Sequence, residues 1–161
     1  GDVNFSHSYQ PASTSDFQIS SMNISNSAPL ASSARYNPIQ QSVDLTSQIV
    51  DGEVIFSIKS EVAGMIGTQF NIVYDDTRLE LKNVIFDTGN EMTNFANHIE
   101  EEGKINIGSF DQQFTQTVKT GTPYQLIFTP LVELSNTSGL ISFKVNEGVK
   151  ADGTQIKLNM E

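Results

Sequence analysis

The sequence contains neither cysteine nor tryptophan. Without cysteine, the chain can form no disulfide framework and no thiolate metal site. No apolar run approaches the ~18 residues needed to span a bilayer. The first ten residues lack the basic region and the apolar run of a signal peptide. The chain also begins without methionine, so we expect a processed product or a part of a longer protein.

Basic residues are scarce as well. Nine Lys and Arg stand against 19 Asp and Glu, which gives a net charge of −10. Such a surface repels phosphate backbones and anionic lipids, so we expect neither nucleic acid nor a membrane as a partner. Charged residues make up only 17% of the chain, and Ser, Thr, Asn and Gln carry most of the remaining polarity. This composition suits a component of a large protein assembly.

Catalytic motifs are absent too. The sequence has no G-x-S-x-G motif and no glycine-rich phosphate loop. His7 lies in a polar N-terminal region. His98 stands close to the glutamates at 100–102, where a solvated strand end is favoured over a weak divalent-cation site. We therefore predict that the protein is not an enzyme and that it binds no cofactor.

Weak calcium binding is an alternative that the sequence leaves open, because calcium needs only oxygen ligands. The turn DTGNE at 87–91 gathers several oxygens, but it lacks the D-x-[DN]-x-[DN]-G pattern of a calcium loop, so we assign no metal ligand. Carbohydrate binding would require an exposed aromatic platform, which the sequence does not indicate. The oxygen-bearing candidates for calcium are Asp75, Asp76, Asp87, Thr88, Asn90 and Glu91.

Residues 1–40 differ from the rest of the chain and are predicted to form an extended arm. They are rich in Ser, Asn, Pro and Ala, and their apolar residues are isolated. Such a segment cannot bury enough apolar surface to offset its ordering entropy. It is either a flexible linker or an arm that becomes ordered against a partner, with a short strand near 16–24. In the second case its anchors would be Phe5, Tyr9, Phe17, Ile19, Met22, Ile24 and Tyr36.

Residues 41–161 are predicted to form one folded domain of strands. Apolar and polar residues alternate in EVIFSIKS at 53–60, TQFNIVY at 68–74 and LISFKVNEG at 140–148. This period of two is typical of strands with one buried face and one solvated face. No amphipathic helix of ten or more residues is visible. The predicted turns lie at 51–53, 63–67, 87–90, 100–104, 119–123, 136–139 and 151–153. The pattern predicts an all-β sandwich of the jelly-roll type with about nine strands.

The stretch GTQFNIVYDDTRLELKNVIF at 67–86 shows a strand, a turn and a second strand in most detail. Asp75 and Thr77 can accept hydrogen bonds from backbone N–H groups in a tight turn. Arg78 is expected to pair with the acidic residues before it or with Glu80, and Leu79 is expected to return to the core. The acidic residues therefore have a sufficient structural role.

This stretch resembles the strand–turn–strand signature of cohesin domains and of the related carbohydrate-binding-module sandwiches. In those families an amphipathic strand ends in Tyr-Asp, a short turn follows, and Leu-Glu begins the next strand. GKINIGSF resembles their G-x-I-x-[IVF] strand, and GLISFKVNEG with TQIKLN resembles their closing pair of strands. The resemblance spans roughly residues 44–160 and implies a cohesin-like β-sandwich. The N-terminal arm has no counterpart in those families.

We therefore predict a non-catalytic structural or interaction module that docks onto protein subunits of a larger assembly. The arm and the sandwich surface would both make contact, and Phe110 and Phe114 in the irregular segment 109–123 would contribute from the sandwich. A virion component, either a capsid decoration or a tail part, is the first candidate. The alternatives are an extracellular scaffold or cohesin-like protein-binding module, and a carbohydrate-binding module. The expected location is extracellular or on a virion surface.

Overall fold

The computed structural model describes residues 39–161, and these form nine strands and one short 3₁₀ helix. This confirms the predicted all-β class. The bounds are β1 Ile39–Val50, β2 Glu53–Ser60, β3 Met65–Tyr74, β4 Leu79–Phe86, β5 Thr93–Ile99, η2 Glu100–Glu102, β6 Lys104–Phe110, β7 Gly121–Pro130, β8 Ile141–Lys150 and β9 Gln155–Met160. No helix in this range is long and apolar enough to cross a membrane.

Several sequence-based predictions concern residues outside the described range. They are the seven arm anchors from Phe5 to Tyr36, His7, and the strand expected near 16–24. The first described strand, β1, begins at Ile39. The division into an arm at 1–40 and a domain at 41–161 stays a prediction.

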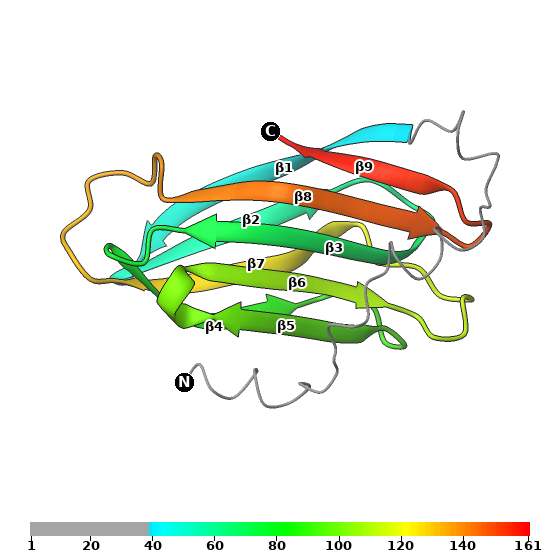
Figure 1. The fold of residues 1–161 in the computed structure, drawn as a ribbon, viewed down its shortest axis with the longest axis horizontal. Coiled ribbons are helices and arrows are strands. Elements are labelled where there is room, and N and C mark those ends of the chain that lie inside the picture. The colour runs from blue at the N-terminus through cyan, green and yellow to red at the C-terminus, as the bar shows by residue number, and fades with distance from the viewer. Residues whose placement is uncertain (1–38) are drawn as a thin grey trace.

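The nine strands form one continuous sheet that is folded over into two layers (Figure 1). Their order along the sheet is β4-β7-β2-β1-β9-β8-β3-β6-β5. We call β4, β7, β2 and β1 the back layer, and β9, β8, β3, β6 and β5 the front layer. Strand β1 joins the two, because residues 39–43 pair in parallel with β9 while residues 44–50 pair antiparallel with β2. The result is the predicted sandwich.

The inward faces of the two layers enclose one apolar core. Phe56 of β2 and Leu126 and Phe128 of β7 face it from the back layer, and Phe70 and Ile72 of β3 face it from the front layer. Each of these five side chains is 2% exposed or less. Burial of this apolar surface is the main force that holds the layers together. The predicted alternation of buried and solvated positions is confirmed in these strands.

Tyr124 links the two layers by hydrogen bonds inside the core. It lies on β7, and its ring meets the ring of Phe70 on β3 with the centroids 5.5 Å apart. Its hydroxyl group forms hydrogen bonds with the hydroxyl groups of Thr68 on β3 and Ser109 on β6. Burial raises the pKa of Tyr124 to about 12, because the charged phenolate is disfavoured away from water. All three buried hydroxyl groups are therefore satisfied within the protein.

Parts of the fold differ from the sequence-based expectation. The turn predicted at 63–67 is wrong from Met65 onward, where β3 has already begun. A shift of register between Met65 and Gly67 puts Met65 in the main core and Ile66 in a separate cluster, which hides the alternation. The turn predicted at 119–123 ends earlier, because β7 begins at Gly121. Strands β1 and β5 are not evident from the sequence pattern.

Candidate functional site

The turn after β3 is built around Asp75, as predicted, and its role is structural. The carboxylate accepts hydrogen bonds from the backbone N–H of Thr77 at 3.0 Å, from the Thr77 hydroxyl at 2.5 Å and from Arg78 Nε at 2.7 Å. These bonds, that of the Thr77 hydroxyl first, lower the pKa of Asp75 to about 2. Leu79 returns to the core with 1% exposure. Both carboxylate oxygens of Asp75 are engaged within the turn, so they are not free for calcium.

The other calcium candidate, the turn at 87–91, is neutralised by a lysine. Lys119 Nζ lies 3.1 Å and 3.2 Å from the two carboxylate oxygens of Asp87. The Thr88 hydroxyl donates to Asn94 Oδ1 at 2.6 Å. Nowhere in residues 39–161 do three His, Cys, Asp or Glu side chains gather as a metal site would require. Weak calcium binding gains no support from this part of the chain.

His98 is not the solvated strand end that the sequence suggested. It lies on β5, it is half-buried, and its Nε2 is 2.6 Å from the hydroxyl oxygen of Tyr74 on β3. The two rings lie near one another, with centroids 5.9 Å apart. Of the neighbouring glutamates, Glu102 pairs with Lys104 at 3.1 Å. His98 therefore helps to pack the front layer.

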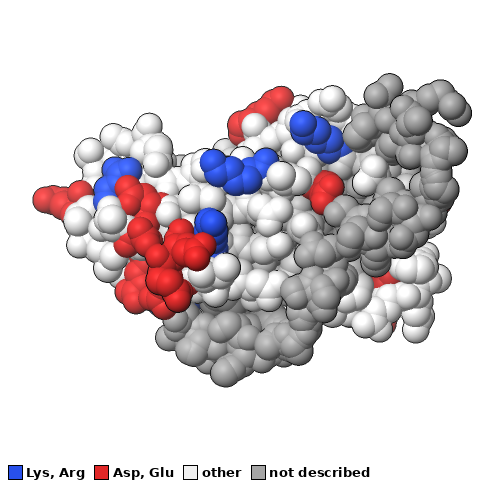
Figure 2. Space-filling model, in the orientation of Figure 1, with Lys and Arg blue, Asp and Glu red and all other residues white. Residues whose placement is uncertain are grey.

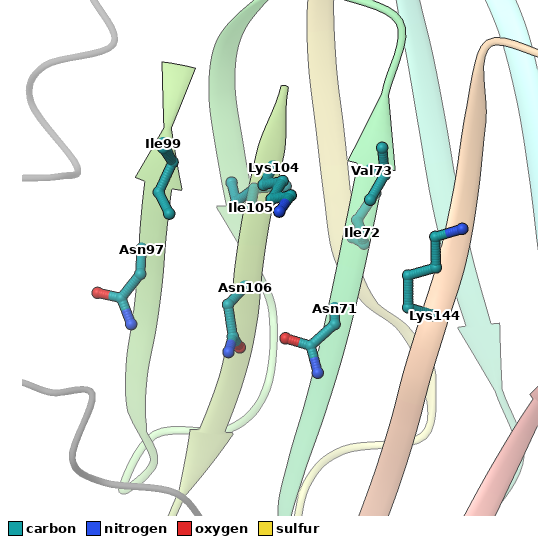
Figure 3. Close-up of a pocket in the computed structure, with 9 residues that line it drawn as sticks. All are labelled: Asn71, Ile72, Val73, Asn97, Ile99, Lys104, Ile105, Asn106 and Lys144. Carbon is teal, nitrogen blue, oxygen red and sulfur yellow. The ribbon is translucent and has the colours of Figure 1, made fainter. Parts of the chain in front are cut away.

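The polar side chains that do converge lie on the outer face of the front layer, the side that points away from the core. The strand register sets Asn71 of β3 opposite Asn106 of β6, and Asn106 opposite Asn97 of β5. Residues opposite one another on adjacent strands point to the same side of a sheet. The three side chains therefore form a row across three strands (Figure 3), which we call the asparagine ladder.

A hollow of about 430 Å³ lies on the outer face and includes the asparagine ladder among its lining residues. The row beside the ladder holds Ile99 of β5, Lys104 of β6 and Val73 of β3, which are also opposite in register. Lys144 of β8 borders the hollow on the far side (Figure 3). Ile99 is 46% exposed although it is aliphatic. The hollow therefore offers apolar surface directly beside amide groups.

Three buried amide oxygens of the front layer lack a hydrogen-bond partner among the described residues. Oδ1 of Asn106, in the middle of the asparagine ladder, and Oε1 of Gln69, two residues before Asn71 on β3, belong to residues of the outer face, and the third is Oδ1 of Asn146 on β8. Leaving a buried acceptor unpaired costs ~1–3 kcal/mol, so such groups are rare in folded proteins. The amide nitrogen of Asn71, by contrast, donates to the carbonyl oxygen of Val145 at 3.2 Å.

Charge is unevenly distributed over the front of the molecule (Figure 2). Acidic side chains gather at the end that carries η2, whose three residues are all glutamates. Lysines lie toward the middle of the view, and Lys104 and Lys144 line the hollow. The outer face therefore combines both signs of charge with uncharged amides and aliphatic side chains.

The two contacts predicted on the sandwich, Phe110 and Phe114, lie in different environments. Phe110 ends β6, is half-buried, and packs against Ile66 and Val149. Phe114 lies in the loop after β6, is 55% exposed, and has a positive φ of 60°. Phe114 is the one aromatic residue of the described range with a largely exposed side chain. Their role in partner binding stays a prediction.

The loop that carries Phe114 is organised by a buried carboxylate. Asp111 is 5% exposed and accepts hydrogen bonds from three backbone N–H groups and one hydroxyl in the following five residues. These contacts, above all the one with the N–H of Gln116, lower the pKa of Asp111. The segment 111–120 is thus an ordered loop between β6 and β7.

Sequence reasoning did not identify the asparagine ladder. Each asparagine occupies a polar position in an alternating strand and so resembles any solvent-facing residue. Only the register between the strands shows that the three are neighbours. The one available signal was the recurrence of Asn near the middle of three stretches, NIVY, INIG and ANHI.

The architecture is that of cohesin domains. The type II cohesin A11 of Bacteroides cellulosolvens has a TM-score of 0.61 and 18% identity, and the match covers 75% of this chain and 95% of that one. The seventh ScaB type I cohesin of Pseudobacteroides cellulosolvens has a TM-score of 0.53 and 25% identity, covering 76% and 89%. The sixth cohesin of Acetivibrio cellulolyticus scaffoldin B, solved in complex with a Cel5 dockerin mutant, has a TM-score of 0.53 and 18% identity, covering 78% and 100%.

These likenesses confirm the cohesin-like fold that was predicted from the strand–turn–strand stretch at 67–86. No protein-family model matches the chain, and no curated protein matches it either. The likeness therefore lies in the fold, and the function has to be argued from the surface of this chain.

Proposed function

We propose that the protein is a non-catalytic protein-binding module that docks a partner on the outer face of its front layer. The asparagine ladder carries this proposal, because its three half-buried amide side chains stand in one row beside the exposed side chain of Ile99. The sheet holds these amides in fixed positions, so a partner can pair with them at little further entropic cost.

The chemistry of the face fits a protein surface as its ligand. Protein interfaces combine an apolar centre with about one hydrogen bond per 100–200 Å². Here Ile99 and Val73 supply exposed or half-exposed aliphatic surface, and the ladder supplies amides that can both donate and accept. Lys104 and Lys144 at the border would contribute orientation and association rate. A sugar platform is less suited, since Tyr74 and Tyr124 are both buried in the core.

The partner we propose is a dockerin-type module within an extracellular protein assembly. The cohesin of scaffoldin B described above was solved with a dockerin, and the OlpC cohesin of Clostridium thermocellum, with 15% identity and a TM-score of 0.54, was solved in a cohesin–dockerin complex. Both favour the binding-module alternative among the sequence-based predictions. None of the solved structures named here supports a virion component.

Binding to a panel of purified dockerin modules, measured by isothermal titration calorimetry, tests the proposal. We expect saturable binding to at least one of them. Asn106→Leu, which keeps the side-chain size but removes the amide, should weaken that binding about tenfold, the equivalent of one lost hydrogen bond. Gln125→Leu is the matched control, because Gln125 is an amide-bearing residue of β7 in the back layer.

The control should bind as the unmodified protein does. Absence of saturable binding across the panel would contradict the dockerin-type partner. Equal losses from Asn106→Leu and Gln125→Leu would contradict the choice of face.

A further inference from the structure

We propose that the segment around residues 16–24 of the same chain packs as a third layer on the outer face of the front layer, at the end that carries Phe110. The proposal does not depend on the proposed function, because it concerns the free protein. It is carried by a second apolar cluster on the outer face and by the place where the described chain begins.

The second cluster lies outside the main core. Ile66 and Val149 are 8% and 4% exposed, and Phe110 packs against them. Phe95, on β5, is 5% exposed and belongs to neither apolar cluster. A Cβ atom added to Gly108 of β6 would lie 2.6 Å from Phe95 Cζ, so the ring packs directly over this glycine. Apolar residues on the outer side of a two-layer sandwich have no second layer to bury them. Their low exposure here is what a covering third layer would produce.

The described part of the chain begins at the same end of the front layer as this cluster. Ile39 pairs with Ile156 of β9, which pairs with Gly148 of β8, and Gly148 pairs with Thr68 of β3. The same row continues through Ser109 of β6 to Asn94 of β5, next to Phe110 and Phe95 in sequence. The cluster and the start of β1 therefore lie at the same end of the front layer.

The preceding residues are long enough to reach the cluster. With ~4.8 Å between neighbouring strands, β5 lies five steps, or about 24 Å, from β1. The fourteen residues between positions 24 and 39 could span on the order of 50 Å when extended. The segment is therefore long enough to cross the front layer with chain to spare.

The chemistry of the segment suits this surface. Phe17, Ile19, Met22 and Ile24 are its apolar residues, and Asp16 is its single charge. A nearly uncharged segment with closely spaced apolar side chains matches a cluster of Ile, Val and Phe side chains. A segment of about nine residues is too short to bury its own apolar side chains, but each anchor that enters the cluster removes apolar surface from water.

Disulfide cross-linking tests the proposal cleanly, because the natural chain has no cysteine. We suggest Ser21→Cys in the segment, combined with Thr93→Cys on β5, whose register partner is Phe110. The matched control combines Ser21→Cys with Ile85→Cys, since Ile85 is 40% exposed on β4 of the back layer. Both full-length double variants are oxidised at low protein concentration and resolved on a non-reducing gel.

We expect an intramolecular cross-link with Thr93→Cys at a yield several-fold above that with Ile85→Cys. Equal yields would overturn the proposal, because they would describe an arm that samples both layers alike. Absence of cross-links at Thr93→Cys would overturn it too. Cross-linked dimers in place of the intramolecular product would mean that a second copy supplies the segment, which contradicts packing within one chain.

Hydrogen–deuterium exchange on the full chain gives an independent readout. Replacing Phe17, Ile19, Met22 and Ile24 by Ser should speed exchange of the amides in β5 and β6 several-fold. Phe5→Ser with Tyr9→Ser serves as the control and should leave that exchange unchanged. Unaltered exchange in the fourfold variant, or an equal increase in the control, would overturn the proposal.

Discussion

At the scale of single residues, Tyr124 shows how a polar group can stabilise an apolar core. Its hydroxyl group bridges from the back layer to Thr68 and Ser109 in the front layer. Tyr124→Phe removes this bridge, while Thr68 and Ser109 remain register partners that can bond to each other. We expect the free energy of unfolding to fall by about 1 kcal/mol. Urea denaturation at neutral pH measures it, and an unchanged midpoint would contradict a stabilising role for the bridge.

The same tyrosine predicts a change of stability in alkali. Its pKa is about 12 in the folded protein against an ordinary value of 10.0. Above pH 10 the unfolded chain loses the phenolic proton while the folded chain keeps it. The protonated Tyr124 therefore makes its full contribution to the free energy of unfolding below about pH 10. That contribution declines as pH rises toward 12, by about 1.4 kcal/mol per pH unit for one proton. Denaturation of Tyr124→Phe should show a shallower alkaline decline, and equal slopes would contradict the assignment.

Asp75 predicts the corresponding effect in acid. Its pKa is about 2 in the folded protein against an ordinary value of 3.8, because the Thr77 hydroxyl and then Arg78 stabilise the carboxylate. A lowered pKa gives stability that is present above about pH 4 and is lost as pH falls toward 2. Asp75→Asn should therefore lower the melting temperature at neutral pH, and its difference from the unmodified protein should shrink below pH 4.

The control for that experiment is the neighbouring acid. Asp76 is exposed, and its carboxylate makes none of the turn's hydrogen bonds described above. Asp76→Asn should leave the melting temperature nearly unchanged at all pH values. Thermal unfolding followed by circular dichroism compares the two variants, and equal effects would show that the turn depends on net charge and not on the Asp75 hydrogen bonds.

What a sequence can predict about single residues follows from how local their interactions are. The bonds of Asp75 to Thr77 and Arg78 lie within three positions of it, and they were predicted. The partners of Tyr124 are 56 and 15 positions away, and His98 is 24 positions from Tyr74. No local pattern encodes such pairs, so the roles of Tyr124 and His98 emerged only from the fold.

At the scale of elements, the alternation that predicted β2 reflects one buried face and one more exposed face. Strand β8 departs from its predicted alternation, because Val145 is 54% exposed while Asn146 is buried. Strand β2 alternates in sequence because Val54, Phe56 and Ile58 all point inward. Strand β1 has no such signal, since Val43 is its single fully buried residue. Strand β5 places Phe95 and Ala96 on opposite sides of the sheet, and both are buried. A period of two disappears when both faces, or neither, are covered.

Strand β1 also yields a prediction about how the layers are joined. Val43 is 1% exposed at the point where β1 passes from β9 to β2. Val43→Ala should lower the free energy of unfolding by about 1–3 kcal/mol, because it leaves a cavity in the core. Ile49→Ala is the matched control on the same strand, since Ile49 is 44% exposed. Similar losses in the two variants would contradict the joining role assigned to Val43.

At the scale of the whole molecule, one sheet folded through β1 creates an outer face on each side, and the two faces differ in chemistry. The front layer carries the asparagine ladder, the hollow and the second apolar cluster. The class of fold could be predicted from alternation and from the cohesin resemblance. The proposed docking face could not, because it depends on register across β3, β6 and β5, which no single stretch contains.

Docking on the front layer is the central claim, and amide hydrogen–deuterium exchange with and without a bound dockerin module tests it most directly. We predict slower exchange on binding in β3, β5, β6 and β8, with β4, β7 and β2 unchanged. Protection concentrated in β4, β7 and β2 would contradict it.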